Sequence, residues 1–163
     1  MAFTDLQSFL AVLEKEGELK RVAEVVDPEL EVTEIATRAV KENLPALLFE
    51  NVKGSRYPLV INFMATMRRI EMALGRPPDA LGEEIVRFME DVNPPSVGAL
   101  WRNRKTAWRL LKIRPKSTRR ALSQQVVEEP HLDELPTLKC WPEDGGRFIT
   151  LPLVMSRDPK TGA

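Results

Sequence analysis

The 163 residues of the chain suit one full domain and the start of a second. Lys and Arg number 24, as do Asp and Glu, so overall charge indicates no polyanionic partner, and the single cysteine excludes an internal disulfide and favours a reducing cytoplasm. The apolar runs are too short to span a bilayer, and no basic region precedes an apolar stretch at the start, so we expect neither an integral membrane segment nor a signal peptide.

The first fifty residues predict helix, strand, helix and strand in turn. Thr4 with Gln7 is typical of a capping box, and the helix that it opens should end at Gly17. Residues 18–26 are rich in valine and predict a strand, and residues 46–50 predict another. The helix expected between these two strands has an apolar stripe made of Val32, Ile35, Ala36 and Ala39.

Residues 57–64 predict a third strand, reached from the second through a short turn at Gly54. A strand–helix–strand crossover gives a parallel pair, whereas a short turn gives an antiparallel neighbour. The predicted fold class is therefore α/β (α+β), with a mixed β-sheet flanked by helices.

Further helices are predicted after these strands. Met67, Ile70 and Leu74 recur at helical spacing. Asp79 is a suitable N-cap for the next helix, and residues 97–111 again have a helical pattern. The apolar face of the helix after Asp79 consists of Leu81, Ile85, Phe88 and Met89.

We divide the chain into an amino-terminal α/β domain at residues 1–114, a connector at 115–136 and the start of a second domain at 137–163. Within the last region, residues 140–146 predict a turn-rich loop and residues 148–155 predict a strand. We expect this tail to lie outside the core, so that its removal leaves the melting of the first domain nearly unchanged.

The residues themselves predict no catalytic, cofactor-binding or metal-binding position. His131 lies in a polar stretch, Cys140 has no evident activating base, and together they do not supply the four ligands of a typical zinc site. Gly145-Gly146 precedes a predicted strand, whereas a phosphate-binding loop leads into a helix. Adjacent acids point apart on a helix or strand, so we expect them at the surface. These adjacent acids are Glu83-Glu84 and Glu128-Glu129.

Basic residues accumulate around Trp101 and Trp108, and no acid occurs between Asn93 and Val127. A basic stripe with aromatics can bind nucleic acid or lie on an anionic membrane. Alternatively, the two tryptophans, one heptad apart, pack inward while the cations face water. We favour this second interpretation and expect no nucleic-acid partner. The basic residues are Arg102, Arg104, Lys105, Arg109, Lys112, Arg114, Lys116, Arg119 and Arg120.

A group of motifs near the end of the chain carries a family resemblance. The motifs are Lys139-Cys140-Trp141-Pro142, Asp144-Gly145-Gly146, Ile149-Thr150-Leu151-Pro152 and Asp158-Pro159 with Thr161-Gly162. Together with residues 5–22, 44–54 and 68–75, they resemble the UbiD family, the decarboxylases of polyprenyl-hydroxybenzoate and related aromatic or unsaturated acids. The resemblance covers essentially the whole chain.

This resemblance implies a reaction that uses prenylated flavin mononucleotide (prFMN) with a divalent metal, manganese, and potassium. It further implies a flavin prenyltransferase as cofactor supplier, a homo-oligomer, a cytoplasmic location and a pathway such as ubiquinone biosynthesis. Residues 148–155 would form the first strand of a split β-barrel domain that binds the flavin.

The resemblance also implies that the family's metal-binding asparagine, its catalytic arginine and its catalytic acids lie beyond residue 163. We therefore expect an amino-terminal fragment of a decarboxylase that is inactive and holds no cofactor by itself. Two alternatives stay open: a free-standing interaction module that uses the basic segment 102–120, and a subunit of a split decarboxylase.

Overall fold

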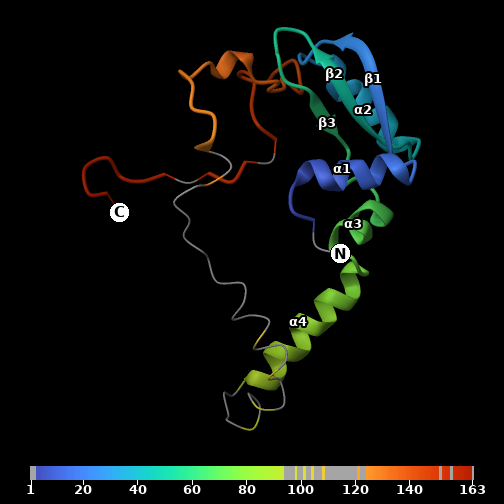
Figure 1. Ribbon diagram of the computed structural model, residues 1–163, viewed down its shortest axis with the longest axis vertical. Helices are drawn as coiled ribbons and strands as arrows, with labels where there is room; N and C mark the ends of the chain where they lie inside the picture. The colour runs from blue at the N-terminus through green and yellow to red at the C-terminus, as the bar shows by residue number, and fades with distance from the viewer. Residues whose placement is uncertain are drawn as a thin grey trace. The chain divides into compact units, whose positions relative to one another are not determined.

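The computed structural model describes residues 3–93, 98, 101, 104, 108, 121, 124–150, 152–154 and 156–162 (Figure 1). The chain divides into two compact units. Asp5–Thr66 and His131–Ala163 form the first, which we call the sheet unit. Met67–Pro130 forms the second together with Met1–Thr4, and we call it the helical unit. No helix among the described residues is long and apolar enough to cross a membrane.

The sheet unit opens with α1, Leu6–Lys15, whose cap differs from the predicted one. Asp5 is the N-cap, its carboxylate accepts a bond of 2.7 Å from the backbone N–H of Ser8, and the Ser8 hydroxyl lies 3.4 Å from the Asp5 N–H. The capping box of Thr4 with Gln7 is therefore wrong by one residue, because aspartate caps as well as threonine does and serine at the third position returns the bond. Gly17 follows the helix with a φ of 73°, as the sequence predicts.

Three strands form the sheet in the order β1-β2-β3. β1, Leu19–Val26, pairs in parallel with β2, Ala46–Val52, and β3, Leu59–Ile61, pairs with β2 in the antiparallel sense. The mixed sheet predicted from the sequence is thus confirmed. β2 runs two residues longer than predicted and β3 is shorter. A bulge in β1 is held by Asn51, whose side-chain amide donates to the Ala23 carbonyl at 2.8 Å.

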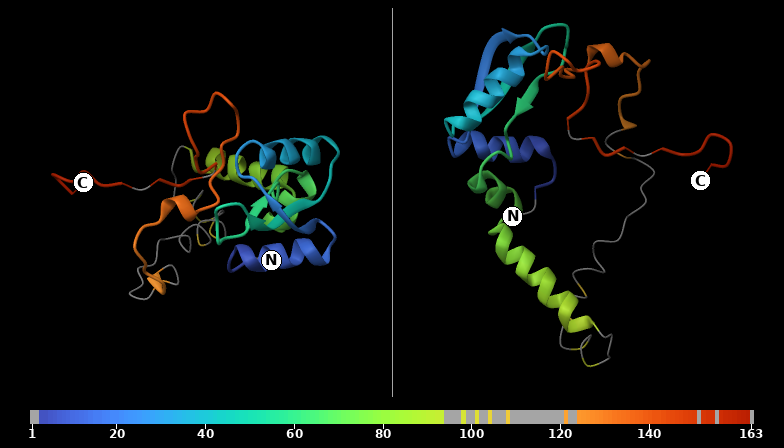
Figure 2. Two further views of the ribbon diagram at one scale, coloured as in Figure 1. Left: turned by 90° about the horizontal axis from the view of Figure 1, so that it is seen from above. Right: turned by 180° about the vertical axis from the view of Figure 1, so that it is seen from behind.

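Helix α2, Glu31–Lys41, makes the crossover between β1 and β2 and lies along one face of the sheet (Figures 1 and 2). Its predicted stripe is confirmed, since Val32 and Ala39 are buried and Ile35 and Ala36 are half-buried. The core cluster between α2 and the sheet consists of Val26, Val32, Phe49, Val52 and Ile61.

The tail does not lie apart from this core. Leu138 packs against the core cluster, and the backbone of Lys139 pairs with the chain just after β1. The Leu30 N–H donates to the Lys139 carbonyl at 2.9 Å, and the Lys139 N–H donates to the Pro28 carbonyl at 3.2 Å. The expectation that the tail is separate from the core is therefore wrong for residues 138 and 139, whereas the three domain boundaries stay predictions.

The strand predicted at residues 148–155 is wrong over its described part. Phe148 makes one isolated antiparallel bridge with Leu138, and residues 149, 150 and 152–154 are not in strand conformation. Local valine, leucine and isoleucine content favours a strand, but a strand also needs a neighbour to pair with, and Pro152 has no N–H to donate. The β-barrel stays a prediction.

The helical unit contains α3, Met67–Leu74, and α4, Pro78–Val92. Gly75 closes α3 with a φ of 70°. Asp79 is not the N-cap of α4, because Pro77 takes that position and the helix begins at Pro78, two residues earlier than predicted. Proline suits this first helical position, where a missing N–H costs nothing. Residues 98, 101, 104 and 108 are helical, and the other residues of the helix predicted at 97–111 lie outside the described part.

Candidate functional site

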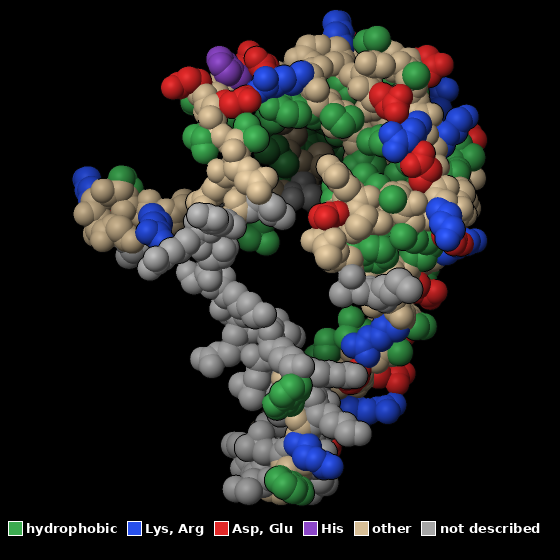
Figure 3. Space-filling model, viewed as in Figure 1, with side chains coloured by type: hydrophobic (Ala, Val, Ile, Leu, Met, Phe, Trp, Pro, Cys, Tyr) green, Lys and Arg blue, Asp and Glu red, His purple; other side chains and the backbone are tan. Residues whose placement is uncertain are grey.

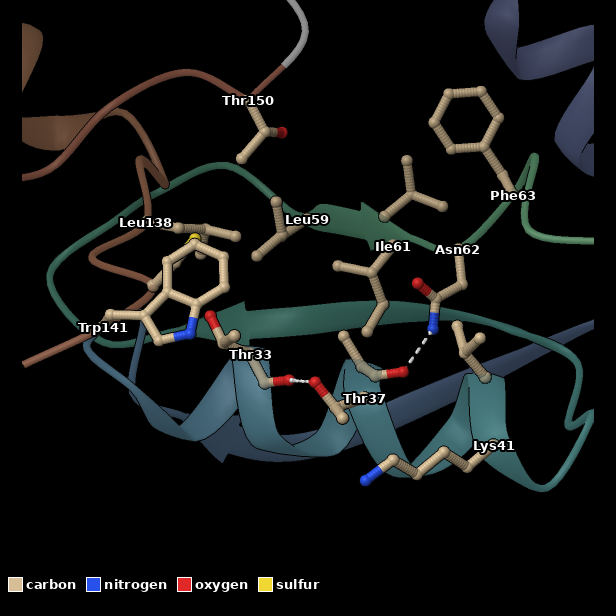
Figure 4. A pocket seen from close by; sticks show the side chains of 14 residues that line it. Thr33, Thr37, Lys41, Leu59, Ile61, Asn62, Phe63, Leu138, Trp141 and Thr150 are labelled. Carbon is tan, nitrogen blue, oxygen red and sulfur yellow. Dashed lines mark hydrogen bonds between the residues drawn. The ribbon is translucent and has the colours of Figure 1, made fainter.

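A groove of about 530 Å³ opens in the sheet unit (Figures 3 and 4). Hydrophobic side chains gather around the hollow in the space-filling view. The described residues that line it come from α2, from β3 with the two residues after it, and from the tail. They are Thr33, Ala36, Thr37, Val40, Lys41, Leu59, Val60, Ile61, Asn62, Phe63, Leu138, Cys140, Trp141 and Thr150.

Helix α2 forms the first wall of the groove. Thr33, Thr37 and Lys41 are four residues apart, so they lie in one row along the helix (Figure 4). The row lies beside the stripe that packs on the sheet. Asn62 ends β3 with a φ of 59°, and its side-chain amide donates to the Ala36 carbonyl at 2.9 Å. This bond ties the end of β3 to α2 and fixes that end of the groove.

The second wall is the loop at residues 140–146, and its turn-rich character is confirmed. The Asp144 carboxylate accepts from the N–H groups of Cys140, at 3.1 Å, and Trp141, at 2.9 Å. The Asp144 N–H in turn donates to the Trp141 carbonyl at 3.1 Å. These bonds hold the exposed indole of Trp141 over one end of the groove (Figure 4).

Charged side chains cluster where the parallel strands β1 and β2 end, and we call this cluster the junction. The Lys53 ammonium lies 2.7 Å from the Asp27 carboxylate, and the Lys139 ammonium lies 3.3 Å from Glu29. Lys53 and the backbone N–H of Glu29 lower the pKa of the Asp27 carboxyl, and the positive charge of Arg147 adds to the effect. The same ion pair raises the pKa of Lys53. The junction connects the tail to the sheet through charge as well as through backbone bonds.

The residues weighed for chemistry in the sequence do not come together. His131 is exposed, and Cys140 is half-buried in the groove wall. Glu83 pairs with Arg87 at 2.9 Å, whereas Glu84 pairs with Arg76, so these two acids face different partners. In the part of the chain that the structure describes, no three His, Cys, Asp or Glu side chains gather as metal ligands would. That no residue here is catalytic or binds a cofactor or metal stays a prediction.

The inward packing predicted for the two tryptophans is wrong. Trp101 is 72% exposed and Trp108 is 61% exposed. Arg104, one helical turn after Trp101, lies over its indole with 5.6 Å between the guanidinium carbon and the ring centre. The other eight basic residues of this segment lie outside the described residues.

Sequence reasoning missed both the groove and the junction. The ion pair between Glu29 and Lys139 joins residues 110 positions apart, and the bonds that flank it belong to the backbone. No local pattern encodes such contacts. The one available signal was the clustering of charge and turn residues at 27–31 directly after a predicted strand of a parallel pair, an edge where polar groups commonly meet.

Two family models match the chain. The 3-octaprenyl-4-hydroxybenzoate carboxy-lyase N-terminal domain matches residues 10–89, and the Rift-related domain of the same carboxy-lyase matches residues 114–163. An uncharacterized protein of Archaeoglobus fulgidus is 41% identical over 99% of this chain. The chain spans 34% of that relative's length.

Solved structures are similar to the chain as well. The UbiD-class enzyme HmfF from Pelotomaculum thermopropionicum, in complex with FMN, matches 96% of this chain and 32% of its own, with a TM-score of 0.63 and 25% identity. An evolved dimeric form of HmfF in complex with prFMN, at 24% identity and the same TM-score over 98% of this chain and 34% of its own, supports the fold alone. Vanillic acid decarboxylase of Sedimentibacter hydroxybenzoicus, in its closed form, matches 90% of this chain and 29% of its own, at 27% identity and a TM-score of 0.63. The chain therefore belongs to the UbiD family, whose amino-terminal domain and the beginning of whose next domain it contains.

Proposed function

We propose that this chain is the amino-terminal part of a decarboxylase that uses prFMN to release carbon dioxide from an aromatic or unsaturated acid. Support comes from the two family models, which together reach from residue 10 to residue 163, and from the similarity to HmfF and to vanillic acid decarboxylase. When bound, the flavin would supply the electron sink for decarboxylation, and the protein would supply binding and orientation.

The described residues do not fit the flavin or its metal. A flavin phosphate needs several N–H donors or cations, and a metal needs several oxygen ligands. Among the described residues that line the groove, Lys41 is the only charged one, and the walls are mostly apolar. We therefore derive no catalytic step from this chain. We propose that the cofactor, manganese and potassium bind to the remaining two thirds of the enzyme and that this chain alone is inactive.

The part of the work that this chain can perform is structural. The junction and the bonds of Lys139 join part of the region that matches the Rift-related domain to the sheet of the N-terminal domain. A decarboxylase of this kind needs its flavin and its acidic groups held in a fixed geometry, and a rigid connection between neighbouring domains contributes to that.

Neither alternative is favoured. One family match ends before the basic segment and the other begins within it, at residue 114, and both belong to one family of enzymes, which does not favour a free-standing module. No observation on this chain favours a split enzyme. A homo-oligomer in the cytoplasm, supplied with its cofactor by a flavin prenyltransferase and acting in ubiquinone biosynthesis or another aromatic acid pathway, completes the proposal.

The test compares the chain alone with a chimera in which it replaces the first third of the Archaeoglobus fulgidus relative. Both proteins are incubated with prFMN and manganese, desalted, and assayed for flavin absorbance and for bound metal. The chimera should retain a stoichiometric amount of flavin and the chain alone should retain none. Retention by the chain alone, or a folded chimera that retains no flavin, would overturn the proposal.

A further inference from the structure

Two tryptophans and an arginine form one exposed face in the helical unit. Trp101 is 72% exposed and Trp108 is 61% exposed, and both are in helical conformation, as is Arg104 between them. Spacings of three and four residues place all three on the same side of a helix, and we call them the tryptophan face. Tryptophan is usually well covered, so an exposed pair on one side indicates a surface that meets a partner.

Arg104 is held against this face by two contacts with Trp101. Its guanidinium carbon lies 5.6 Å from the centre of the indole ring, and one of its N–H groups donates to the Trp101 carbonyl at 3.4 Å. The first contact is a cation–π interaction, which keeps a positive charge directly beside apolar surface. The face therefore suits a partner that offers negative charge and an apolar layer close together.

The segment that carries the face is strongly basic. Residues 94–126 contain nine Lys and Arg residues and no acid, whereas the chain as a whole has equal numbers of each. Eight of the nine lie outside the described residues and count here only by their charge. Glu83 and Glu84, two acids of the same unit, already pair with Arg87 and Arg76. The charge of the segment thus complements an anionic partner.

We propose that the tryptophan face binds the surface of an anionic membrane, with both indoles in the interfacial layer and Arg104 against lipid phosphate. Indole rings favour the boundary between headgroups and acyl chains, where the ring is covered and its N–H stays among polar groups. Arginine binds phosphate oxygens, and a basic segment is attracted to anionic lipids. Apolar insertion combined with this attraction is typical of peripheral attachment. The inference goes beyond the proposed function and needs no free-standing module, because an enzyme chain can carry such a surface.

A single-stranded nucleic acid is the other partner that cations and aromatic rings commonly bind together. Base stacking needs an open ring face, and Arg104 already covers one face of the Trp101 indole. Insertion into a lipid interface does not need an open ring face. The contact between Arg104 and Trp101 therefore favours the membrane surface, and nucleic acid forms a separate arm of the test.

The chain offers its own reporter, since it contains three tryptophans and two of them form the face. In the variant Trp141→Phe, all indole fluorescence comes from Trp101 and Trp108. This variant is mixed at physiological salt with vesicles of phosphatidylcholine alone, or of phosphatidylcholine with about one third phosphatidylserine. Its emission should shift to shorter wavelength with the anionic vesicles, and its partitioning into them, measured by co-sedimentation, should be at least about tenfold stronger than into neutral ones.

Co-sedimentation of further variants tests the face itself. The double variant Trp101→Ala, Trp108→Ala should bind anionic vesicles at least about tenfold more weakly, because apolar insertion is lost. Trp141→Ala is the matched control, since Trp141 is 60% exposed but belongs to the sheet unit, and it should leave the binding unchanged. Circular dichroism verifies the fold of each variant.

Three results would overturn the proposal. The first is equal partitioning into neutral and anionic vesicles, and the second is unchanged binding by the folded double variant. The third is tighter binding to a single-stranded oligonucleotide than to anionic vesicles at the same salt, which would make nucleic acid the partner. None of these measurements involves flavin or decarboxylation, so their failure is distinct from a failure of the proposed function.

Discussion

Leu138→Ala tests whether the tail is part of the folded sheet unit. Leu138 is half-buried and packs against the core cluster that includes Val32 and Phe49. Replacing a fully buried leucine by alanine lowers the unfolding free energy by about 2–5 kcal/mol, so the same change at the half-buried Leu138 should lower it by about 2 kcal/mol. For a chain of this length that corresponds to a fall in Tm of roughly 4–8 °C.

The matched control is Leu132→Ala, because Leu132 precedes Leu138 by six residues and is largely exposed. It should change the unfolding free energy by less than about 0.5 kcal/mol. Thermal and urea unfolding followed by circular dichroism measure both variants. Two equally small effects would show that residues near 138 do not contribute to the core, and the separate tail expected from the sequence would be restored.

Three further predictions concern local features. Gly17→Ala should destabilise the chain by about 1 kcal/mol because of its φ of 73°, whereas Gly82→Ala, in open space on α4, should stabilise it by about 0.5–1 kcal/mol; thermal melts that show the same sign for both would contradict this. Asp5→Ala should lower the unfolding free energy by about 1 kcal/mol because the N-cap of α1 is lost, and Gln7→Ala should lower it by less than about 0.5 kcal/mol. If urea unfolding gives the larger loss for Gln7→Ala, the cap predicted from the sequence is right instead. Because its ion pair holds the pKa of Asp27 below the ordinary 3.8, the stabilisation that it gives is complete above that pH and is lost as pH falls below it, so Asp27→Asn should flatten the acid end of a plot of stability against pH.

The mixed sheet could be predicted because its signals are local. A valine-rich stretch, a helix stripe and a short turn at Gly54 each act over a few residues, and the order of the elements restricts their pairing. Cap positions were less accurate, since Asp5 and Thr4 are neighbours that both suit the role. The choice between them depends on which side chain, three residues after the N-cap, accepts a hydrogen bond from the N-cap backbone N–H. In the structure that side chain is Ser8, three residues after Asp5.

The groove and the junction could not be predicted because they depend on contacts between distant parts of the chain. Lys139 meets Pro28, Glu29 and Leu30 only after the sheet has formed. The strand predicted at residues 148–155 was wrong for the same reason. Apolar content shows that a segment is able to form a strand, but the strand forms only where a second strand is available to pair with it. The motifs from Lys139 onward resemble the UbiD family and predicted the family correctly. The search for catalytic or ligand-binding side chains predicted no function.

The central claim is that this chain can serve as the first third of a decarboxylase, and carbon dioxide release tests it most directly. The chain replaces the matching third of the Sedimentibacter hydroxybenzoicus vanillic acid decarboxylase, and a control chimera carries the matching third of HmfF at the same joint. With prFMN and manganese, both chimeras should release carbon dioxide from vanillic acid, and omission of the flavin should abolish the release. Activity in the control together with none in a folded, flavin-retaining chimera of this chain would contradict the account.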